Sequence, residues 1–206
     1  MKFKFVTTLA WSMVLAMGMF SSVGAQSSTD EIDARANTAE LASQLGNADP
    51  HVRQRSAEAL ARLAAMDQRK MVEGYQLQEK NKEVRLALDW ALYRMGRSEA
   101  LFRVVRELDS GRQQQAIGYL SELESPDFLY PYLKKENNAA RVNAGILKAL
   151  AKIGNSETLP IIESYRESLQ PNVAAAAEIA HDEIEKRLGQ PETTPGRSRP
   201  RAVGKP

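Results

Sequence analysis

The chain has 206 residues, of which 43% are hydrophobic and 26% are charged, and it contains no cysteine. This composition is typical of a soluble globular protein, and the lack of cysteine excludes disulfide bonds, thiolate metal sites and a thiol nucleophile. Two of the 28 basic residues lie in 1–25 and four lie in 190–206, together with one acidic residue, so residues 26–189 have 22 basic and 25 acidic residues. The resulting net charge of −3 argues against a broad nucleic-acid-binding surface.

Residues 1–25 have the pattern of a secretory signal peptide. Two lysines precede a short apolar run, and the small residues Val23 and Ala25 then occupy the two positions that a signal peptidase reads. The apolar run is too short to span a bilayer comfortably, so an uncleaved anchor is the weaker alternative. We therefore expect cleavage between Ala25 and Gln26 and a periplasmic or secreted protein.

The rest of the chain, up to residue 189, alternates between helical periodicity and short turn signals. Ser28 and Glu31 have the spacing of a capping box, while Asp49 and Ser125 each stand before a proline, as N-cap residues often do. Four glycines follow periodic runs, where a backbone with positive φ is expected: Gly46, Gly96, Gly154 and Gly189. The pattern predicts an all-helical chain.

Internal similarity indicates a repeat of about 30 residues. Segment 95–101 (MGRSEAL) matches segment 153–159 (IGNSETL) in character at nearly every position. Apolar pairs three residues apart also recur near the end of the first four units, at Leu60/Leu63, Leu92/Met95, Leu120/Leu123 and Leu150/Ile153. We expect five helical hairpins, each of which buries its apolar stripe against its neighbours. They span 30–66, 67–96, 97–124, 125–154 and 155–189.

Two prolines lie inside the predicted first helices of the last two hairpins. These residues are Pro131 and Pro160. A proline in a helix interior removes one hydrogen bond, so we expect a kink in each helix.

The stretch 45–53 (LGNADPHVR) resembles the HEAT-like repeat, especially the short form found in phycobilisome lyases. Its signature is an aspartate turn, then Val-Arg, then small residues and a leucine, and 82–85 (KEVR) repeats part of it. The resemblance covers about 32–189 and weakens in the later units. It implies an all-α fold, a right-handed α-solenoid of about five stacked helical hairpins.

Arg53 and Arg85 occupy the arginine position of this repeat. In the structural interpretation, each arginine bonds to a turn aspartate or to the backbone of a neighbouring unit and fixes how the repeats stack. Asp49 is then the natural partner on the first turn. An anion-binding groove lined by these arginines is the functional alternative.

The second helix of the second unit is the best candidate for a contact surface. Leu86, Trp90 and Tyr93 form an apolar stripe on it, beside a second apolar stripe on the same helix. A helix that is apolar nearly all round is either buried on both sides or exposes one stripe to a partner. Core packing is the first interpretation. In the second, Arg85, Leu86, Trp90, Tyr93 and Arg94 contact a partner protein from the concave face of the solenoid.

No motif of a known enzyme class is recognisable in the sequence, and we expect no cofactor. The chain has no glycine-rich phosphate loop and no nucleophile elbow. Glu178, His181 and Glu185 share one helix face and could bind a divalent ion, although a solvated face is the simpler interpretation. Chromophore lyases share the repeat type, but they act inside the cell, so a lyase is a less favoured alternative.

The sequence therefore predicts a non-enzymatic, exported scaffold that binds a partner protein. Residues 190–206 contain four of the nine prolines and few apolar residues, so we expect them to remain unfolded. Their basic side chains give a second hypothesis, in which the tail tethers the protein to anionic lipid or to a wall polymer. These residues are Arg197, Arg199, Arg201 and Lys205. A purely solubilising tail is the other interpretation.

Overall fold

The computed structural model describes residues 36–189, which are helical except for short turns and contain no strand. The prediction of an all-helical fold is confirmed. The contacts described below lie within one unit of the structure, from Thr38 onward. The predicted signal peptide, the cleavage point at Ala25 and Gln26, the capping box of Ser28 and Glu31, and the basic tail of 190–206 lie outside the described residues.

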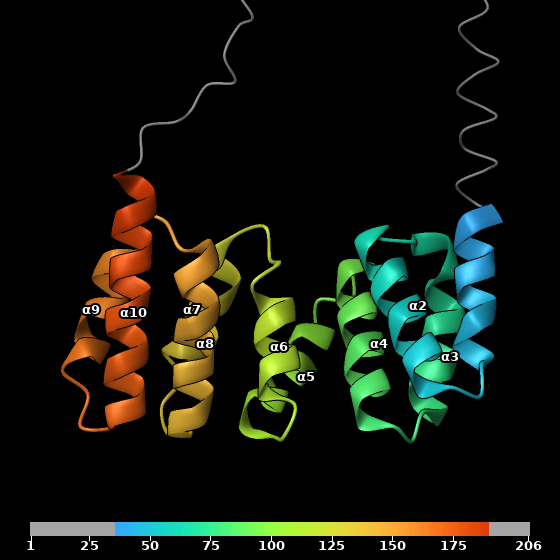
Figure 1. Ribbon diagram of the computed structural model, residues 1–206, viewed down its shortest axis with the longest axis horizontal. Helices are drawn as coiled ribbons and strands as arrows, with labels where there is room; N and C mark the ends of the chain where they lie inside the picture. Colours follow the sequence, from blue (N-terminus) through green and yellow to red (C-terminus); the bar gives the residue numbers. More distant parts are fainter. Residues whose placement is uncertain (1–35, 190–206) are drawn as a thin grey trace, which may run out of the picture. The chain divides into compact units, whose positions relative to one another are not determined.

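The helices follow one another at short intervals (Figure 1). Residues 36–43 are helical. After them come η1 (Gln44–Gly46), α2 (Pro50–Arg62), η2 (Met66–Gln68), α3 (Arg69–Gln78), α4 (Lys82–Arg94), α5 (Ala100–Arg106), η3 (Glu107–Asp109), α6 (Gln113–Leu120), η4 (Pro126–Leu129), α7 (Tyr130–Leu133), α8 (Ala140–Ile153), α9 (Thr158–Arg166) and α10 (Pro171–Leu188), where η marks a 3-10 helix. None of the helices in the described range is long and apolar enough to cross a membrane.

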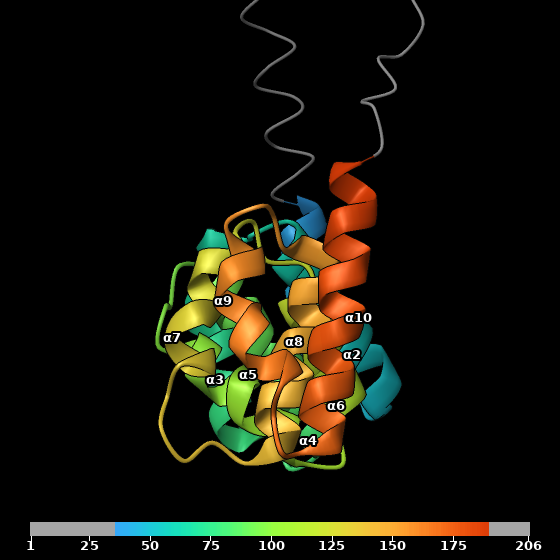
Figure 2. The same cartoon turned by 90° about the vertical axis from the view of Figure 1, so that its left-hand side faces the viewer.

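The helices form two layers. Helices α2, α4, α6, α8 and α10 pack in succession, and each of the last four also packs against the shorter helix before it in the chain. Figure 1 shows these five helices side by side and running in the same direction, and Figure 2 shows the shorter helices α3, α5, α7 and α9 in a second layer, to the left of the first. Apolar side chains of both layers form one continuous core.

Local hydrogen bonds fix where several helices begin. The Asp49 carboxylate accepts the backbone N–H of His51 at 2.9 Å, and the Ser125 hydroxyl accepts that of Asp127 at 3.2 Å. Both N-cap predictions are therefore confirmed. Asn81 caps α4 in the same way, with its side-chain oxygen 3.0 Å from the Val84 nitrogen.

The expectation of positive φ at four glycines is correct at Gly96 alone, where φ is +90°. At Gly154 and Gly189 φ is −60° and −78°, and Gly46 also lacks a positive φ. Gly154 is needed for a different reason. A Cβ atom there would lie 2.5 Å from Cδ1 of Ile184, so the glycine allows α10 to approach the end of α8.

The two prolines expected to kink helices lie instead in first turns. Pro131 is the second residue of α7, which follows the 3-10 helix η4, and Pro160 is the third residue of α9. The first four N–H groups of a helix have no partner within that helix, so Pro160 removes no bond of α9 and the basis for predicting a kink there disappears. Pro131 lies at the junction where η4 continues into α7.

Arginines hold the turn between α3 and α4. The Glu79 carboxylate accepts bonds from Nε and Nη2 of Arg53 at 2.8 and 3.0 Å, and it also accepts the backbone N–H of Asn81 at 2.8 Å. Arg85 donates to the carbonyl oxygen of Glu79. The expected pairing of Arg53 with Asp49 is thus replaced by one with Glu79, since Asp49 caps α2.

Later turns use arginines at other sequence positions. Arg112 pairs with Glu107 at 2.5 Å, and Arg141 donates to the carbonyl oxygen of Ser110 at 2.9 Å. Arg187 of α10 donates to carbonyl oxygens at the end of α8. Because these guanidinium groups are engaged with turns and helix ends, the arrangement argues against an arginine-lined anion groove.

We predict that Glu79→Gln lowers the stability of the fold at neutral pH. The bonds from Arg53 hold the pKa of Glu79 below its ordinary value of 4.5, and its side chain is only 8% exposed. A lowered pKa contributes stability that is present above the ordinary pKa and is lost as the pH falls through the folded-state pKa. The free energy of unfolding should drop by about 1–3 kcal/mol at neutral pH, measured by urea unfolding followed by circular dichroism.

The difference between the wild-type chain and the Glu79→Gln variant should shrink as the pH falls well below 4.5. An equal difference at acidic and neutral pH would show that the charge of Glu79 does not stabilise this turn.

We also predict opposite effects for alanine at two glycines. Gly96→Ala forces an alanine to φ +90° and should destabilise the fold by about 1 kcal/mol or more. Gly74 lies within α3 with no atom within 4 Å of an added Cβ, so Gly74→Ala should stabilise by about 0.5–1 kcal/mol. Thermal unfolding of both variants checks the pair, and a shift of the same sign would contradict the assigned backbone at Gly96.

Candidate functional site

Helix α4 is buried on most of its surface. Leu86 and Trp90 are only 1% and 2% exposed, so the interpretation that they contact a partner is wrong and core packing holds for both. They are buried because α2 packs on one side of α4 and α5 and α6 pack on the other. Arg85 belongs to the Glu79 turn at the start of α4. Of the five predicted contact residues, only Tyr93 and Arg94 line a surface hollow without being buried in the core.

A stack of aromatic rings lies beneath this part of the surface. Trp90 stacks against Tyr93 of the same helix, with ring centroids 5.4 Å apart, and against Tyr119 of α6, at 5.6 Å and 2° between the planes. The Arg94 guanidinium lies 5.8 Å from the centroid of the Trp90 ring. Such contacts add to the stability gained from burial, so α4 and α6 are held together through this stack.

Tyr119 also connects α6 to α2. Its hydroxyl donates to the Glu58 carboxylate at 2.6 Å and accepts a bond from Gln115 at 2.8 Å. Burial and the nearby carboxylate raise the pKa of Tyr119, so its hydroxyl remains a donor. The role of Tyr119 could not be predicted from the sequence, because nothing in the local pattern indicates a partner that lies 61 residues away.

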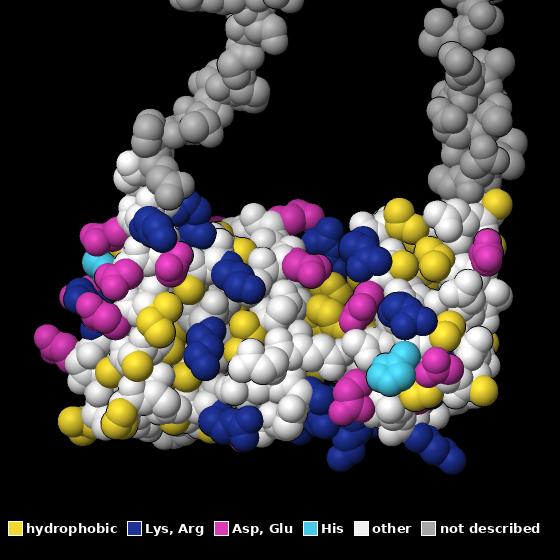
Figure 3. Space-filling model, viewed as in Figure 1, with side chains coloured by type: hydrophobic (Ala, Val, Ile, Leu, Met, Phe, Trp, Pro, Cys, Tyr) yellow, Lys and Arg dark blue, Asp and Glu magenta, His cyan; other side chains and the backbone are white. Residues whose placement is uncertain are grey.

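A shallow hollow of about 240 Å³ lies above this bond. Its lining comes from α2, α4 and the α6 region, and consists of Glu58, Arg62, Trp90, Gln115, Gly118, Tyr119 and Glu122. Figure 3 shows hydrophobic side chains on the surface between α4 and α6, with acidic and basic side chains around them.

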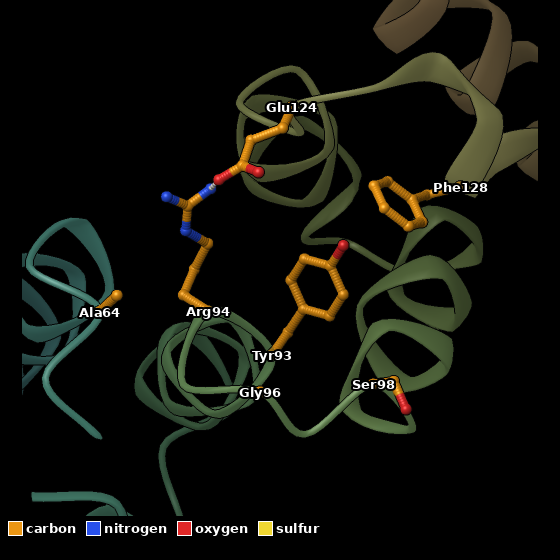
Figure 4. A pocket seen from close by; sticks show the side chains of 7 residues that line it. All are labelled: Ala64, Tyr93, Arg94, Gly96, Ser98, Glu124 and Phe128. Atoms are coloured by element: carbon orange, nitrogen blue, oxygen red, sulfur yellow. Dashed lines mark ion pairs between the residues drawn. The ribbon is translucent and has the colours of Figure 1, made fainter. Parts of the chain in front are cut away.

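A second hollow, of about 330 Å³, lies where α4 ends (Figure 4). We call it the Tyr93 hollow, and it is lined by Ala64, Tyr93, Arg94, Gly96, Ser98, Glu124 and Phe128. In Figure 4 the Tyr93 ring extends toward Phe128, and Arg94 extends toward Glu124. Phe128 is 48% exposed although it is aromatic.

The polar groups of the Tyr93 hollow are loosely paired. Arg94 Nη1 lies 3.6 Å from Oε1 of Glu124, whose side chain is 81% exposed. Partial burial raises the pKa of Tyr93, which keeps its hydroxyl protonated and able to donate. The hollow therefore offers two aromatic rings, two hydroxyls, one guanidinium and one carboxylate to a binding partner.

The predicted trio of Glu178, His181 and Glu185 does not converge on one point. Glu178 binds Arg166 at 2.6 Å, whereas Nδ1 of His181 lies 3.6 Å from Glu185 and Nε2 lies 3.8 Å from Glu163. Within residues 36–189, no group of three or more His, Cys, Asp and Glu side chains has the geometry of a metal site.

Comparison of the chain with models of protein families, with curated proteins and with solved structures finds no match.

We predict that Trp90→Ala destabilises the fold strongly, because it removes a buried ring and its stacking contacts. The free energy of unfolding should fall by about 3–5 kcal/mol, measured by urea unfolding followed by circular dichroism. Phe102, an aromatic residue of α5 that is 45% exposed, gives the matched control. Phe102→Ala should lower the free energy of unfolding much less. Equal decreases for the two variants would contradict the burial of Trp90.

Proposed function

We propose that the protein is an exported, non-enzymatic scaffold that binds a partner protein at the Tyr93 hollow. The proposed architecture is a HEAT-like, right-handed α-solenoid of five helical hairpins, with α2, α4, α6, α8 and α10 as the second helices. Three features support the architecture: the repeat of about 30 residues, the two helical layers and the common direction of the second helices. The signal-peptide pattern of 1–25 supports a periplasmic or secreted location.

The observation that carries the binding proposal is the half-exposed aromatic and charged lining of the Tyr93 hollow. Phe128 remains 48% exposed, while Trp90, only a few ångströms from Tyr93, is almost fully buried. Tyrosine, phenylalanine and arginine are enriched at protein interfaces, and tyrosine and arginine are also enriched among residues that dominate binding energy. A partner side chain placed between Tyr93 and Phe128 would bury apolar area on both rings.

The loose pair of Arg94 and Glu124 favours a protein partner for a second reason. At 3.6 Å and with Glu124 largely in solvent, the pair gains little from its mutual attraction. Exchanging a weak surface pair for charge-assisted bonds to a partner costs little, and such bonds become stronger when the partner excludes water. Arg94 and Glu124 can therefore orient a partner that the aromatic rings anchor.

The stable stack beneath the hollow suits this role. Tyr93 is held against Trp90, and Trp90 against Tyr119, so the floor of the hollow is ordered before a partner arrives. Preorganised contact groups reduce the entropy lost on binding. The alternative functions, a tail-mediated tether and a chromophore-lyase-like enzyme, gain no comparable support from the described residues.

Site-specific photo-crosslinking tests the proposal. A photoreactive phenylalanine analogue replaces Phe128 in one full chain and Phe102 in another, since the two rings are 48% and 45% exposed. We expect a discrete cross-linked protein from position 128 and none of the same mass from position 102. Adding Arg94→Glu to the first chain should abolish the cross-link, because it reverses the charge that orients the partner.

Three results would contradict the assignment of the binding surface. These are no discrete product from position 128, the same product from both positions, or a product that survives Arg94→Glu. Recovery of the protein with membranes, released by salt and lost on deletion of 190–206, would instead support the tail as a tether to anionic lipid.

A further inference from the structure

The segment from α6 to α7, which supplies Glu124 and Phe128 to the Tyr93 hollow, has an excess of acidic over basic residues. Residues 113–133 include three acidic residues and no lysine, arginine or histidine. The three are Glu122, Glu124 and Asp127, and all are exposed. Arg94, at 3.6 Å from Glu124, is the one cation within 4 Å of this acidic group among the described residues. A basic ligand is therefore favoured at this edge.

The aromatic walls of the hollow narrow the choice of ligand. Proline-rich segments bind to grooves lined with aromatic side chains, because they are already extended and lose little entropy on binding. Tyr93 and Phe128 provide two such rings on neighbouring parts of the surface (Figure 4). A segment with both proline and arginine matches the rings and the acidic residues together.

The chain contains one such segment in the part that follows α10. Residues 195–201 read PGRSRPR, in which Pro200 stands between Arg199 and Arg201. The whole stretch of 190–206 has four basic residues and a single acidic one, Glu192. Its charge is therefore opposite to that of the 113–133 segment.

The segment is long enough to reach the hollow. Helix α10 ends at Leu188, on the same edge of the structure as the ends of α4 and α6 (Figure 1). Three helix-to-helix steps separate α10 from α4, through α8 and α6, which amounts to roughly 25–30 Å at ordinary packing distances. The 11 residues from 190 to 200 can span roughly 35 Å when extended.

We propose that residues 195–201 of the chain bind in the Tyr93 hollow of the same molecule. Pro200 packs between Tyr93 and Phe128, while Arg199 and Arg201 pair with Glu122 and Glu124. The tail then occupies the surface assigned above to a partner protein and competes with it. Only this competition depends on the proposed function, and binding of the tail itself does not.

Energy transfer from a single tryptophan tests this arrangement in the full chain. The sequence has two tryptophans, Trp11 and Trp90, and no cysteine. Trp11→Phe leaves Trp90 as the sole donor, and Ser198→Cys allows a dansyl acceptor to be attached within the tail. We expect efficient transfer at low salt that decreases as salt is added, because ion pairs hold the tail.

Charge reversal provides the decisive comparison. Glu122→Lys with Glu124→Lys should abolish the transfer, and Arg199→Glu with Arg201→Glu in the same chain should restore it. Glu136→Lys with Glu167→Lys makes the same change in net charge at exposed positions in the α7–α8 and α9–α10 turns, and should leave the transfer unchanged. Circular dichroism confirms that each variant is folded.

Transfer that persists after reversal of Glu122 and Glu124 would overturn the proposal. Transfer that rises with protein concentration would overturn it in favour of a second copy as the occupant, and transfer that appears only with anionic vesicles would assign the tail to lipid. No partner protein is present in the energy-transfer experiment, so its failure would not affect the proposal that a partner binds at position 128. Failure of the crosslinking experiment would likewise not affect the proposal that the tail binds in the hollow.

Discussion

Burial of Trp90 is the constraint on which the rest of this structure depends. Its ring stacks on Tyr119, whose hydroxyl reaches Glu58 of α2, so one buried side chain links three of the packed helices. A large aromatic ring removed from water contributes more than any single polar contact around it. The same ring fixes Tyr93 at the surface, and the candidate site is therefore an extension of the core.

Several arginines act where the chain turns. Glu79 gathers Arg53 and Arg85 at one turn, and Arg112, Arg141 and Arg187 serve other turns and helix ends. Each of these arginines pairs with a carbonyl or carboxylate oxygen at a turn or a helix end. Glu124, which lines the Tyr93 hollow, has only Arg94 within 4 Å among the cations of the described residues, and Glu122 and Asp127, close to it in the sequence, are exposed.

Local features of the fold could be predicted from the sequence, and features that depend on distant partners could not. Asp49 as an N-cap follows from its position before a proline, and it is correct. The partner of Arg53 depends on where the next turn lies in space, so the sequence suggested Asp49 where the structure has Glu79. Gly154 was correctly expected at a helix end but for the wrong reason, since its role is contact with Ile184.

The same difference between local features and features that depend on distant partners applies to the candidate site. Periodicity identified α4 as the best candidate for a contact surface, and Tyr93 and Arg94 do line a hollow. Periodicity cannot tell which of two apolar stripes is covered, so a surface role for Leu86 and Trp90 stayed open beside the preferred assignment to the core. Glu124 and Phe128 were missed because they lie beyond α6 in sequence and meet Tyr93 only through packing. A search for acidic stretches without basic residues would have indicated 122–127.

The most direct test of this account is the access of solvent to Trp90. Acrylamide quenching of tryptophan fluorescence in the full chain with Trp11→Phe reports on that one ring. We predict weak quenching, far below that of a chain in which Trp90→Phe and Phe128→Trp move the sole indole to the exposed wall of the Tyr93 hollow. Equal quenching at the two positions would show that Trp90 is at the surface, and would contradict both the buried stack and the site built on it.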